Sequence, residues 1–298
     1  ETMKNKKIIL IFFLSIIVFL TINEFFYYNI NENQIYPEST PKYKITDVNT
    51  TNNFNLIYKY FNEYLYKAKG FEVIETEHFK LFFKQENRSN VQIVASSAEK
   101  TYDIIGQMFD FFPRFKIPVV IYADQSSMAR AFGWPEEEKV QGVYYMGFIH
   151  LQSPLGNKDY FKEGPMVHEY THLVVDELTG GNYSRWFTEG VAQYVEQQVT
   201  GYTLDMDFDV DEKTKYQLND IFYCFDELPD TAVAYLAALD MTKALIGDGQ
   251  IDEIKNVFSM LKSGACVNEI FLQSVDASHM EGEHIAMANN TYGGVQDE

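Results

Sequence analysis

Hydrophobic residues along the chain follow patterns typical of helices in some segments and of strands in others. Apolar residues recur at helical spacing in 54–70, 95–112, 216–225, 232–245 and 251–261. Short apolar-rich runs of strand length occupy 78–84, 119–122 and 143–151. Strands mixed with helices, followed by helices alone, predict an α+β catalytic domain with a small mixed sheet lobe and a helical C-terminal lobe.

Two further helices are predicted in the middle of the chain. Gly164 followed by Pro165 is a typical helix start, and Gly180 a typical stop. Ser184 is a suitable N-cap for the second helix. The apolar stripe of that helix consists of Phe187, Val191, Tyr194, Val195 and Val199. Glu189 lies off the stripe, on a face shared with Trp186, Gln193 and Glu196 that is either solvated or lines a cleft.

The first of these helices carries the pentad His168-Glu169-Tyr170-Thr171-His172. Residues four apart project from the same helix face, so both imidazoles can bind one cation. Glu169 lies about 100° further round, beside the cation, where a carboxylate can act as general base on a water. Glu189 would complete a His₂Glu ligand set for Zn²⁺. The alternative is a surface or core pair of histidines without a metal.

The segments 164–173 and 185–196 resemble the gluzincin zinc metallopeptidases, in particular the bacterial peptidase MA-like family, with thermolysin and aminopeptidase N as more distant relatives. The likeness extends loosely over 76–271. It implies a zincin-like fold, a peptide or protein substrate, and Zn²⁺ held by His168, His172 and Glu189. Glu169 would be the catalytic base and proton shuttle.

One position departs from the pattern of this family. Four residues after the third ligand, thermolysin-like and aminopeptidase-like enzymes tend to carry an acidic residue, whereas this chain has Gln193. A neutral amide can still hydrogen-bond a ligand imidazole. It should raise the basicity of that imidazole less than a carboxylate would, which predicts lower zinc affinity or rate.

Two further side chains are candidates for the site. Such sites commonly add a Tyr or His donor for the oxyanion, and Tyr235 follows the two helices at a distance similar to that of a Tyr-bearing helix in related metallopeptidases. Core packing is the alternative, because the chain has 21 Tyr. His150 lies on a predicted strand, and zincins of this type use an edge strand there to pair with the extended substrate. His150 therefore either faces the cleft or is a half-buried strand residue without a ligand role.

The N-terminus predicts a location outside the cytoplasm. Lys4, Lys6 and Lys7 precede an unbroken apolar run at 8–22 that lacks a small-residue cleavage pattern after Ile22. Residues 1–22 are therefore interpreted as a signal anchor or uncleaved signal peptide, with a buried core helix as the alternative. Positive charge before the run predicts a cytoplasmic N-terminus and an extracytoplasmic catalytic domain, which would be secreted if the segment is cleaved.

The remaining organisation follows from composition. We expect a stalk at 23–53, the metallopeptidase domain at 54–275 and a flexible tail or fusion scar at 276–298. Acidic residues outnumber basic ones 43 to 24, giving a net charge of -19, which argues against nucleic acid as a partner. Cys224 and Cys266 lack metal-ligand spacing and are either paired or free.

Two other functions remain open at this stage. One is a non-catalytic extracytoplasmic module that binds peptides or the cell envelope around a structural zinc. The other is a metal hydrolase acting on a different amide or ester. The presence of Glu169 argues against the first, since a structural zinc site needs no general base.

Overall fold

The computed structural model describes residues 62–63, 65–135, 140–154, 159, 161, 164–201, 216–247 and 251–281. The chain divides into two units, Glu1–Thr51 and Asn52–Glu298, and every described residue lies in the second. The expected anchor and stalk, most of the expected helix at 54–70 and the tail beyond 281 lie outside the described residues. Within the described ranges, no helix has the length and apolar character needed to span a membrane.

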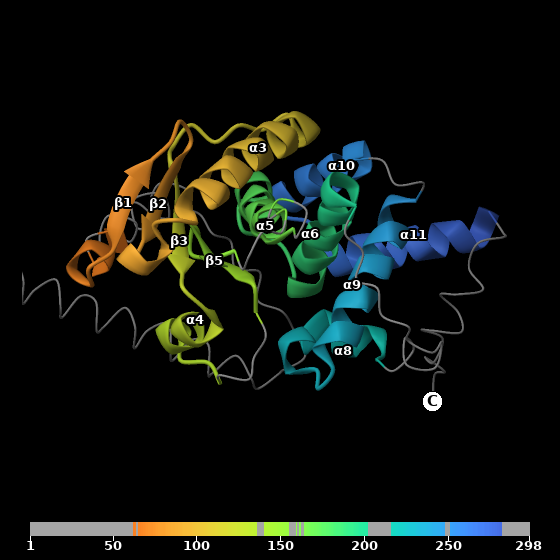
Figure 1. Cartoon of the computed structure of the whole chain (residues 1–298). Coiled ribbons are helices and arrows are strands. Elements are labelled where there is room, and N and C mark those ends of the chain that lie inside the picture. The colour runs from red at the N-terminus through yellow and green to blue at the C-terminus, as the bar shows by residue number, and fades with distance from the viewer. Residues whose placement is uncertain are drawn as a thin grey trace, which may run out of the picture. The chain divides into compact units, whose positions relative to one another are not determined.

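The described residues form a mixed sheet, as predicted (Figure 1). The strands are β1 (Glu72–Glu75), β2 (Phe79–Phe83), β3 (Ile117–Tyr122), β4 (Gly142–Tyr145) and β5 (Phe148–Gln152). They are arranged in the order β1-β2-β3-β5-β4. The three inner strands run parallel, and both edge strands are antiparallel to their neighbours. Among the described strands, β1 and β4 are therefore the two edges of the sheet, and β4 contacts α5.

The single strand expected at 143–151 is wrong, because this segment is a hairpin. Val143 pairs with His150 across it. Met146 and Gly147 have φ values of 48° and 78°, and two consecutive residues with positive φ make the tight turn that suits twisted antiparallel strands. The apolar run shows no polar interruption at this turn. As a result β5 is an inner strand and β4 is the edge.

Helices cover both faces of the sheet. Helix α3 (Val91–Phe109) connects β2 to β3 and packs with α5 (Pro165–Thr179) on one face. Helix α4 (Gln125–Phe132) lies on the opposite face against β3 (Figure 1). Strand alternation separates the two layers. Val119 and Ile121 belong to the core shared with α3 and α5, whereas Val120 and Tyr122 belong to a smaller cluster on the α4 side.

The remaining helices form the predicted helical lobe. They are α6 (Arg185–Thr200), α8 (Leu218–Tyr223), α9 (Thr231–Ile246), α10 (Ile251–Lys262) and α11 (Val267–Glu281), with the short 3₁₀ turn η2 (Phe225–Glu227). A second 3₁₀ turn, η1 (Gln85–Asn87), directly follows β2 in the sheet lobe. Helix α6 lies against α5 and α9. Gly190 permits a close approach to α9, because a β-carbon there would collide with the carbonyl oxygen of Ala238.

Helix α11 was not predicted, and it continues six residues past the expected domain boundary at 275. In the part of α11 whose side chains the structure describes, residues 267–275, the buried apolar residues are Val267 and Phe271. A stripe this short does not stand out in the sequence. Phe271 packs against Trp186 at a ring distance of 5.6 Å. This helix therefore closes the core beneath α6.

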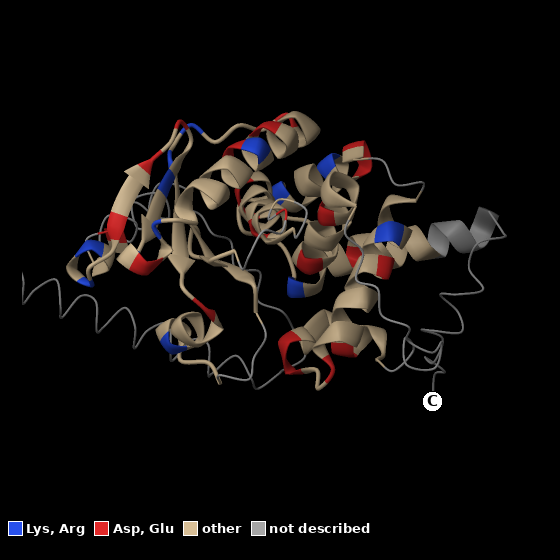
Figure 2. Ribbon diagram, viewed as in Figure 1, with Lys and Arg blue, Asp and Glu red and all other residues tan. Residues whose placement is uncertain are grey.

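The acidic residues are distributed over the described parts of the domain, and its two cysteines are unpaired. Acidic residues are spread over sheet and helices (Figure 2), and the first turns of α8 and η2 contain Asp220, Asp226 and Glu227. Cys224 and Cys266 are both free thiols, and Cys266 is exposed. The choice left open by the sequence between a disulfide and free cysteines is thereby decided in favour of free cysteines.

Candidate metal centre

The helix that carries the pentad begins where the sequence predicts it. Gly164 is the N-cap with φ of 83°, Pro165 follows, and Gly180 ends the helix with φ of 68°. Gly164 is required for a second reason. A β-carbon at this position would collide with the carboxylate of Glu196, which packs against the start of α5. The residue that fixes the helix start thus also admits a charged group of α6.

The two imidazoles and Glu189 meet between α5 and α6. The rings of His168 and His172 have centroids 4.9 Å apart. Glu189 Oε2 lies 3.2 Å from His168 Nε2, and Glu189 Oε1 lies 3.6 Å from His172 Nε2. One ligand atom from each residue lies within 4.8 Å of the others, a cluster that fits a single zinc ion. The structure therefore brings together the three candidate ligands.

The face of α6 that carries Glu189 is not solvated. Glu189 is 2% exposed, and Gln193 and Glu196 are buried as well. Trp186 is fully buried, but it does not line the metal cluster. Its Nε1 donates to Asn268 Oδ1 at 2.8 Å, on the side of α6 that packs against α11. Trp186 is thus shielded from water because it packs in the core, and not because it lines a cleft.

Both histidines are oriented by a partner on α6. His168 Nδ1 donates to Glu196 Oε2 at 3.0 Å, and His172 Nδ1 shares a hydrogen bond with Thr188 Oγ1 at 2.7 Å. These bonds direct both Nε2 atoms toward Glu189 and leave them available for a metal. Glu196 and Thr188 were not predicted to have these roles. The available signal was spacing, since Glu196 lies seven residues, or about two turns, beyond Glu189.

Gln193 makes no hydrogen bond with an imidazole of the described residues. The expectation that its amide takes the place of the family's carboxylate beside a ligand histidine is therefore wrong. Gln193 Nε2 donates to the backbone oxygen of Glu189 at 3.2 Å and to that of Tyr235 at 2.8 Å. Gln193 therefore links α6 to α9. The carboxylate partner of a ligand histidine is present after all, three residues further on, in Glu196.

The charges of the cluster are set by burial and by the contacts just described. Burial would lower the pKa of His168, but its hydrogen bonds with Glu189 and Glu196 raise that pKa well above the usual value. Burial lowers the pKa of His172 to about 3. Burial would raise the pKa of Glu189, but the two histidines and Arg185 lower it to about 2. Ionisation of Glu189 and protonation of His168 therefore favour each other.

Arg185 adds a fixed positive charge to the same carboxylate. Its Nη1 lies 2.7 Å from Glu189 Oε1, and its Nε lies 2.9 Å from Asp226 Oδ1 on η2. The guanidinium thus binds one oxygen of Glu189 and leaves Oε2 toward His168. A ligand carboxylate held in this way keeps its orientation when the metal is exchanged.

Glu169 lies beside the cluster and against the edge strand. Its carboxylate is 6% exposed, accepts a hydrogen bond from the backbone N–H of Tyr144 on β4, and would be 2.9 Å from a β-carbon at Gly142. Burial raises the pKa of Glu169 to about 7. The hydroxyl of Tyr144 donates to Asp176 on α5 at 2.7 Å, and this hydrogen bond connects β4 to α5. A carboxyl group with this pKa can both accept and donate a proton near neutrality.

The two remaining candidates have different positions. Tyr235 on α9 is partly buried, and burial together with the nearby charge of Glu189 raises the pKa of its hydroxyl. The charges of Arg185 and Glu169 also act on it, so Tyr235 lies within electrostatic reach of the metal cluster. His150 does not. It is 4% exposed on the opposite face of the sheet, with Nδ1 3.1 Å from Tyr122 Oη.

The comparison with known families agrees with this geometry. The profile of the Peptidase MA superfamily matches residues 110–286, which is more than half of the chain and includes both helices of the cluster. The chain belongs to the Peptidase MA superfamily and is a zinc metallopeptidase. A comparison with curated proteins found no match.

We expect the purified full chain to bind one equivalent of zinc, and Glu189→Ala to weaken that binding strongly, because the substitution leaves only two of the three ligands. Metal analysis after dialysis against a graded chelator series measures both quantities. Undiminished zinc in Glu189→Ala would place the third ligand elsewhere. Circular dichroism of both metal-free proteins separates a loss of affinity from a loss of fold.

Glu196→Gln should lower zinc affinity by about 10- to 100-fold, because the amide cannot hold His168 as a charged acceptor does. Competition with a fluorescent zinc chelator measures the change. Glu177→Gln is the matched control, since Glu177 is an exposed residue on the same zinc helix. Equal affinities of the two variants would show that Glu196 has no role in orienting His168.

Proposed function

We propose that this metallopeptidase hydrolyses peptide bonds on the outer side of the cytoplasmic membrane, with Glu169 as general base and a zincin-like arrangement of sheet and helices. The observation that carries the proposal is the position of Glu169. It lies next to His168 in sequence, borders the His168–His172–Glu189 cluster and has a pKa of about 7. A structural metal site would not need a buried carboxyl group with this pKa beside it.

The donor set of two imidazoles and one carboxylate fits zinc, which His168, His172 and Glu189 would hold. Zinc, when bound, supplies Lewis acidity to the substrate carbonyl and lowers the pKa of water in its coordination shell. Glu169 accepts the proton of the attacking water at its carboxylate. It then donates this proton to the nitrogen of the leaving amine, so that one carboxyl group serves as base and as acid.

Tyr235 is the proposed donor to the oxyanion. Its hydroxyl lies in the field of Glu169, Glu189 and Arg185, and its raised pKa keeps it protonated at neutral pH. A protonated phenol can donate a hydrogen bond to the carbonyl oxygen as negative charge develops there. Gln193 holds the backbone of Tyr235 against α6 and so fixes the distance between α9 and the cluster.

The edge strand suggests how the substrate is held. β4 borders Glu169 through Gly142 and Tyr144, and among the described strands it pairs with β5 alone. An extended peptide can add to such an edge as a further strand. This role therefore falls to β4, and not to the strand that contains His150.

The location rests on the N-terminal sequence. Three lysines precede the apolar run 8–22, which supports an anchor with the catalytic domain outside the cytoplasm. A peptidase held there would meet extracytoplasmic peptides or proteins as substrates. A non-catalytic binding module is less consistent with the position and pKa of Glu169.

Glu169→Gln should reduce kcat for peptide hydrolysis by about 10²- to 10⁴-fold and leave zinc content unchanged, because the amide keeps the shape but cannot accept the proton. Product release from a peptide library, followed by mass spectrometry, identifies a substrate, and kcat is then measured on it. Glu177→Gln again serves as control. Full activity of Glu169→Gln would rule out the proposed base.

Tyr235→Phe should lower kcat by about 10²- to 10³-fold with little change in KM, since the hydrogen bond is made mainly in the transition state. Steady-state kinetics on the same substrate separates the two parameters. Tyr223→Phe removes a hydroxyl from an exposed tyrosine on α8 and should have no effect. If KM instead rises by about 10²- to 10³-fold and kcat is unchanged, Tyr235 contributes to substrate binding in the ground state.

A further inference from the structure

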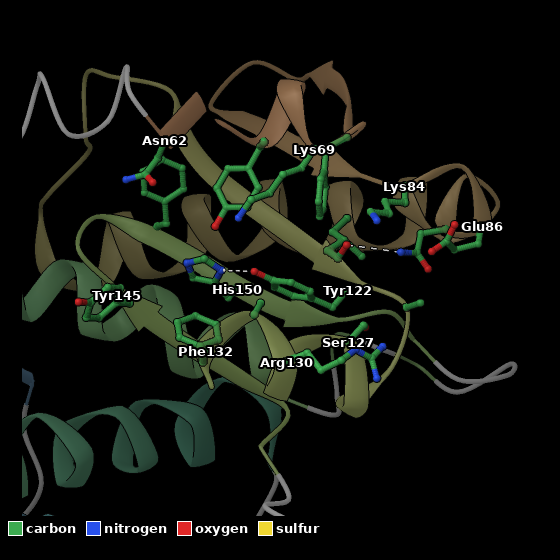
Figure 3. Close-up of a pocket in the computed structure, with 17 residues that line it drawn as sticks. Asn62, Lys69, Lys84, Glu86, Tyr122, Ser127, Arg130, Phe132, Tyr145 and His150 are labelled. Atoms are coloured by element: carbon green, nitrogen blue, oxygen red, sulfur yellow. Dashed lines mark hydrogen bonds between the residues drawn. The ribbon is translucent and has the colours of Figure 1, made fainter. Parts of the chain in front are cut away.

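A cavity of about 810 Å³ lies on the face of the sheet opposite α3 and α5 (Figure 3). Its walls come from the segment before β1, the turn after β2, helix α4 and the ends of β3 and β5. None of its described lining residues belongs to the metal cluster. The volume falls within the range of about 300–1,000 Å³ that is usual for small-molecule sites.

The floor of the cavity contains a buried polar group with a free bonding position. His150 is 4% exposed, and its Nδ1 is bonded to Tyr122 Oη. The other ring nitrogen, Nε2, makes no hydrogen bond with any described residue. It also keeps some solvent-accessible surface, so it is open to the cavity. Figure 3 shows the ring of His150 lining the open space beside Tyr122. Burial lowers the pKa of His150 to about 3, so the ring is neutral at physiological pH.

Aromatic rings form much of the wall around this floor. Phe132 stands at 4.9 Å from the His150 ring in an edge-on arrangement, and Tyr66 lies at 6.4 Å. Phe71 and Phe148 complete the aromatic part of the lining. These rings offer apolar contact area to a flat ligand body.

The charged residues of the lining are mostly basic, in contrast to the chain as a whole. Lys69, Lys84 and Arg130 line the cavity with a single acidic residue, Glu86, whereas the net charge of the chain is -19. Lys84 Nζ lies 5.5 Å from the ring centre of Phe71. Figure 3 shows Lys69 extending across the cavity and Arg130 at its other side. A concentration of basic groups beside aromatic walls favours an anion attached to an apolar body.

We propose that this cavity is a second binding site, independent of the metal centre, for a small organic acid that joins a carboxylate to a flat aromatic body. The carboxylate lies at Lys69 and Lys84, and the aromatic body lies between Phe71 and Phe132 above the floor. His150 Nε2 provides a neutral hydrogen-bonding group to a polar substituent of the ligand. The lining contains no cluster of metal-ligating carboxylates, so a cation is not the expected ligand.

The test uses 2-naphthoate as the probe and 2-naphthamide as its neutral counterpart of the same shape. Isothermal titration calorimetry is performed on the full zinc-loaded chain, with the metal centre saturated by acetohydroxamate so that the zinc cannot bind the carboxylate. We expect one equivalent of 2-naphthoate to bind at least tenfold more tightly than 2-naphthamide. Failure of peptide hydrolysis would not affect this measurement, which requires no catalysis.

Two variants locate the binding. The double variant Lys69→Gln, Lys84→Gln should weaken 2-naphthoate at least fivefold and leave 2-naphthamide unchanged. Ala131→Trp, which places an indole in the lining, should abolish both. Lys100→Gln is the matched control, because Lys100 lies on α3 over the ring of Phe161 and outside the cavity lining. Thermal unfolding of each variant verifies that the fold is retained.

Three results would overturn the proposal. They are no binding of 2-naphthoate, equal affinity for the acid and the amide, and binding that survives both the double variant and Ala131→Trp. Because both lysines are exposed surface residues, their replacement should not prevent folding. The double variant therefore remains informative if Ala131→Trp does not fold.

Discussion

The structure depends on one buried carboxylate, that of Glu189. An ionised carboxylate with 2% exposure costs several kcal/mol to desolvate unless it is well paired. Here it is surrounded by His168 and His172, which link α6 to α5, and by Arg185, which pairs with it from one turn earlier on α6 itself. Zinc would replace the proton of His168 as the positive partner. Metal binding and the packing of the two helices are therefore linked through the same group.

The rest of the domain holds this pairing in place. Gly190 brings α9 close to α6, and Gln193 bonds to the backbone of both helices. Glu196 fits against Gly164 and orients His168 from the far side. Each contact positions a group that either holds the metal or acts beside it. Small changes in helix spacing should therefore affect affinity as well as stability.

The sheet separates two chemical environments with a single set of strands. Alternate side chains of β3 and β5 point to opposite faces, so Ile149 packs beneath the zinc helix while His150 faces the α4 side. The edge strand β4 borders Glu169, and the opposite face of the same sheet forms the floor of the basic aromatic cavity. A peptidase site and a separate anion site can thus share one scaffold without sharing residues.

The sequence by itself determined whatever depends on local geometry. The i, i+4 spacing of His168 and His172 and the glycines at 164 and 180 fix the zinc helix, because helix periodicity and backbone conformation are local properties. Glu189 could be inferred from the missing third ligand. The mixed sheet and the helical lobe followed from the alternation of patterns.

Only the tertiary structure decided which groups meet across elements. The partners of Glu196, Thr188 and Gln193 depend on how α6 lies against α5 and α9, which no spacing rule specifies. The turn at Met146 falls within an unbroken apolar run, so strand pairing rather than composition revealed β4 as the edge. His150 faces away from the metal cluster because sheet register, a long-range property, sets its side.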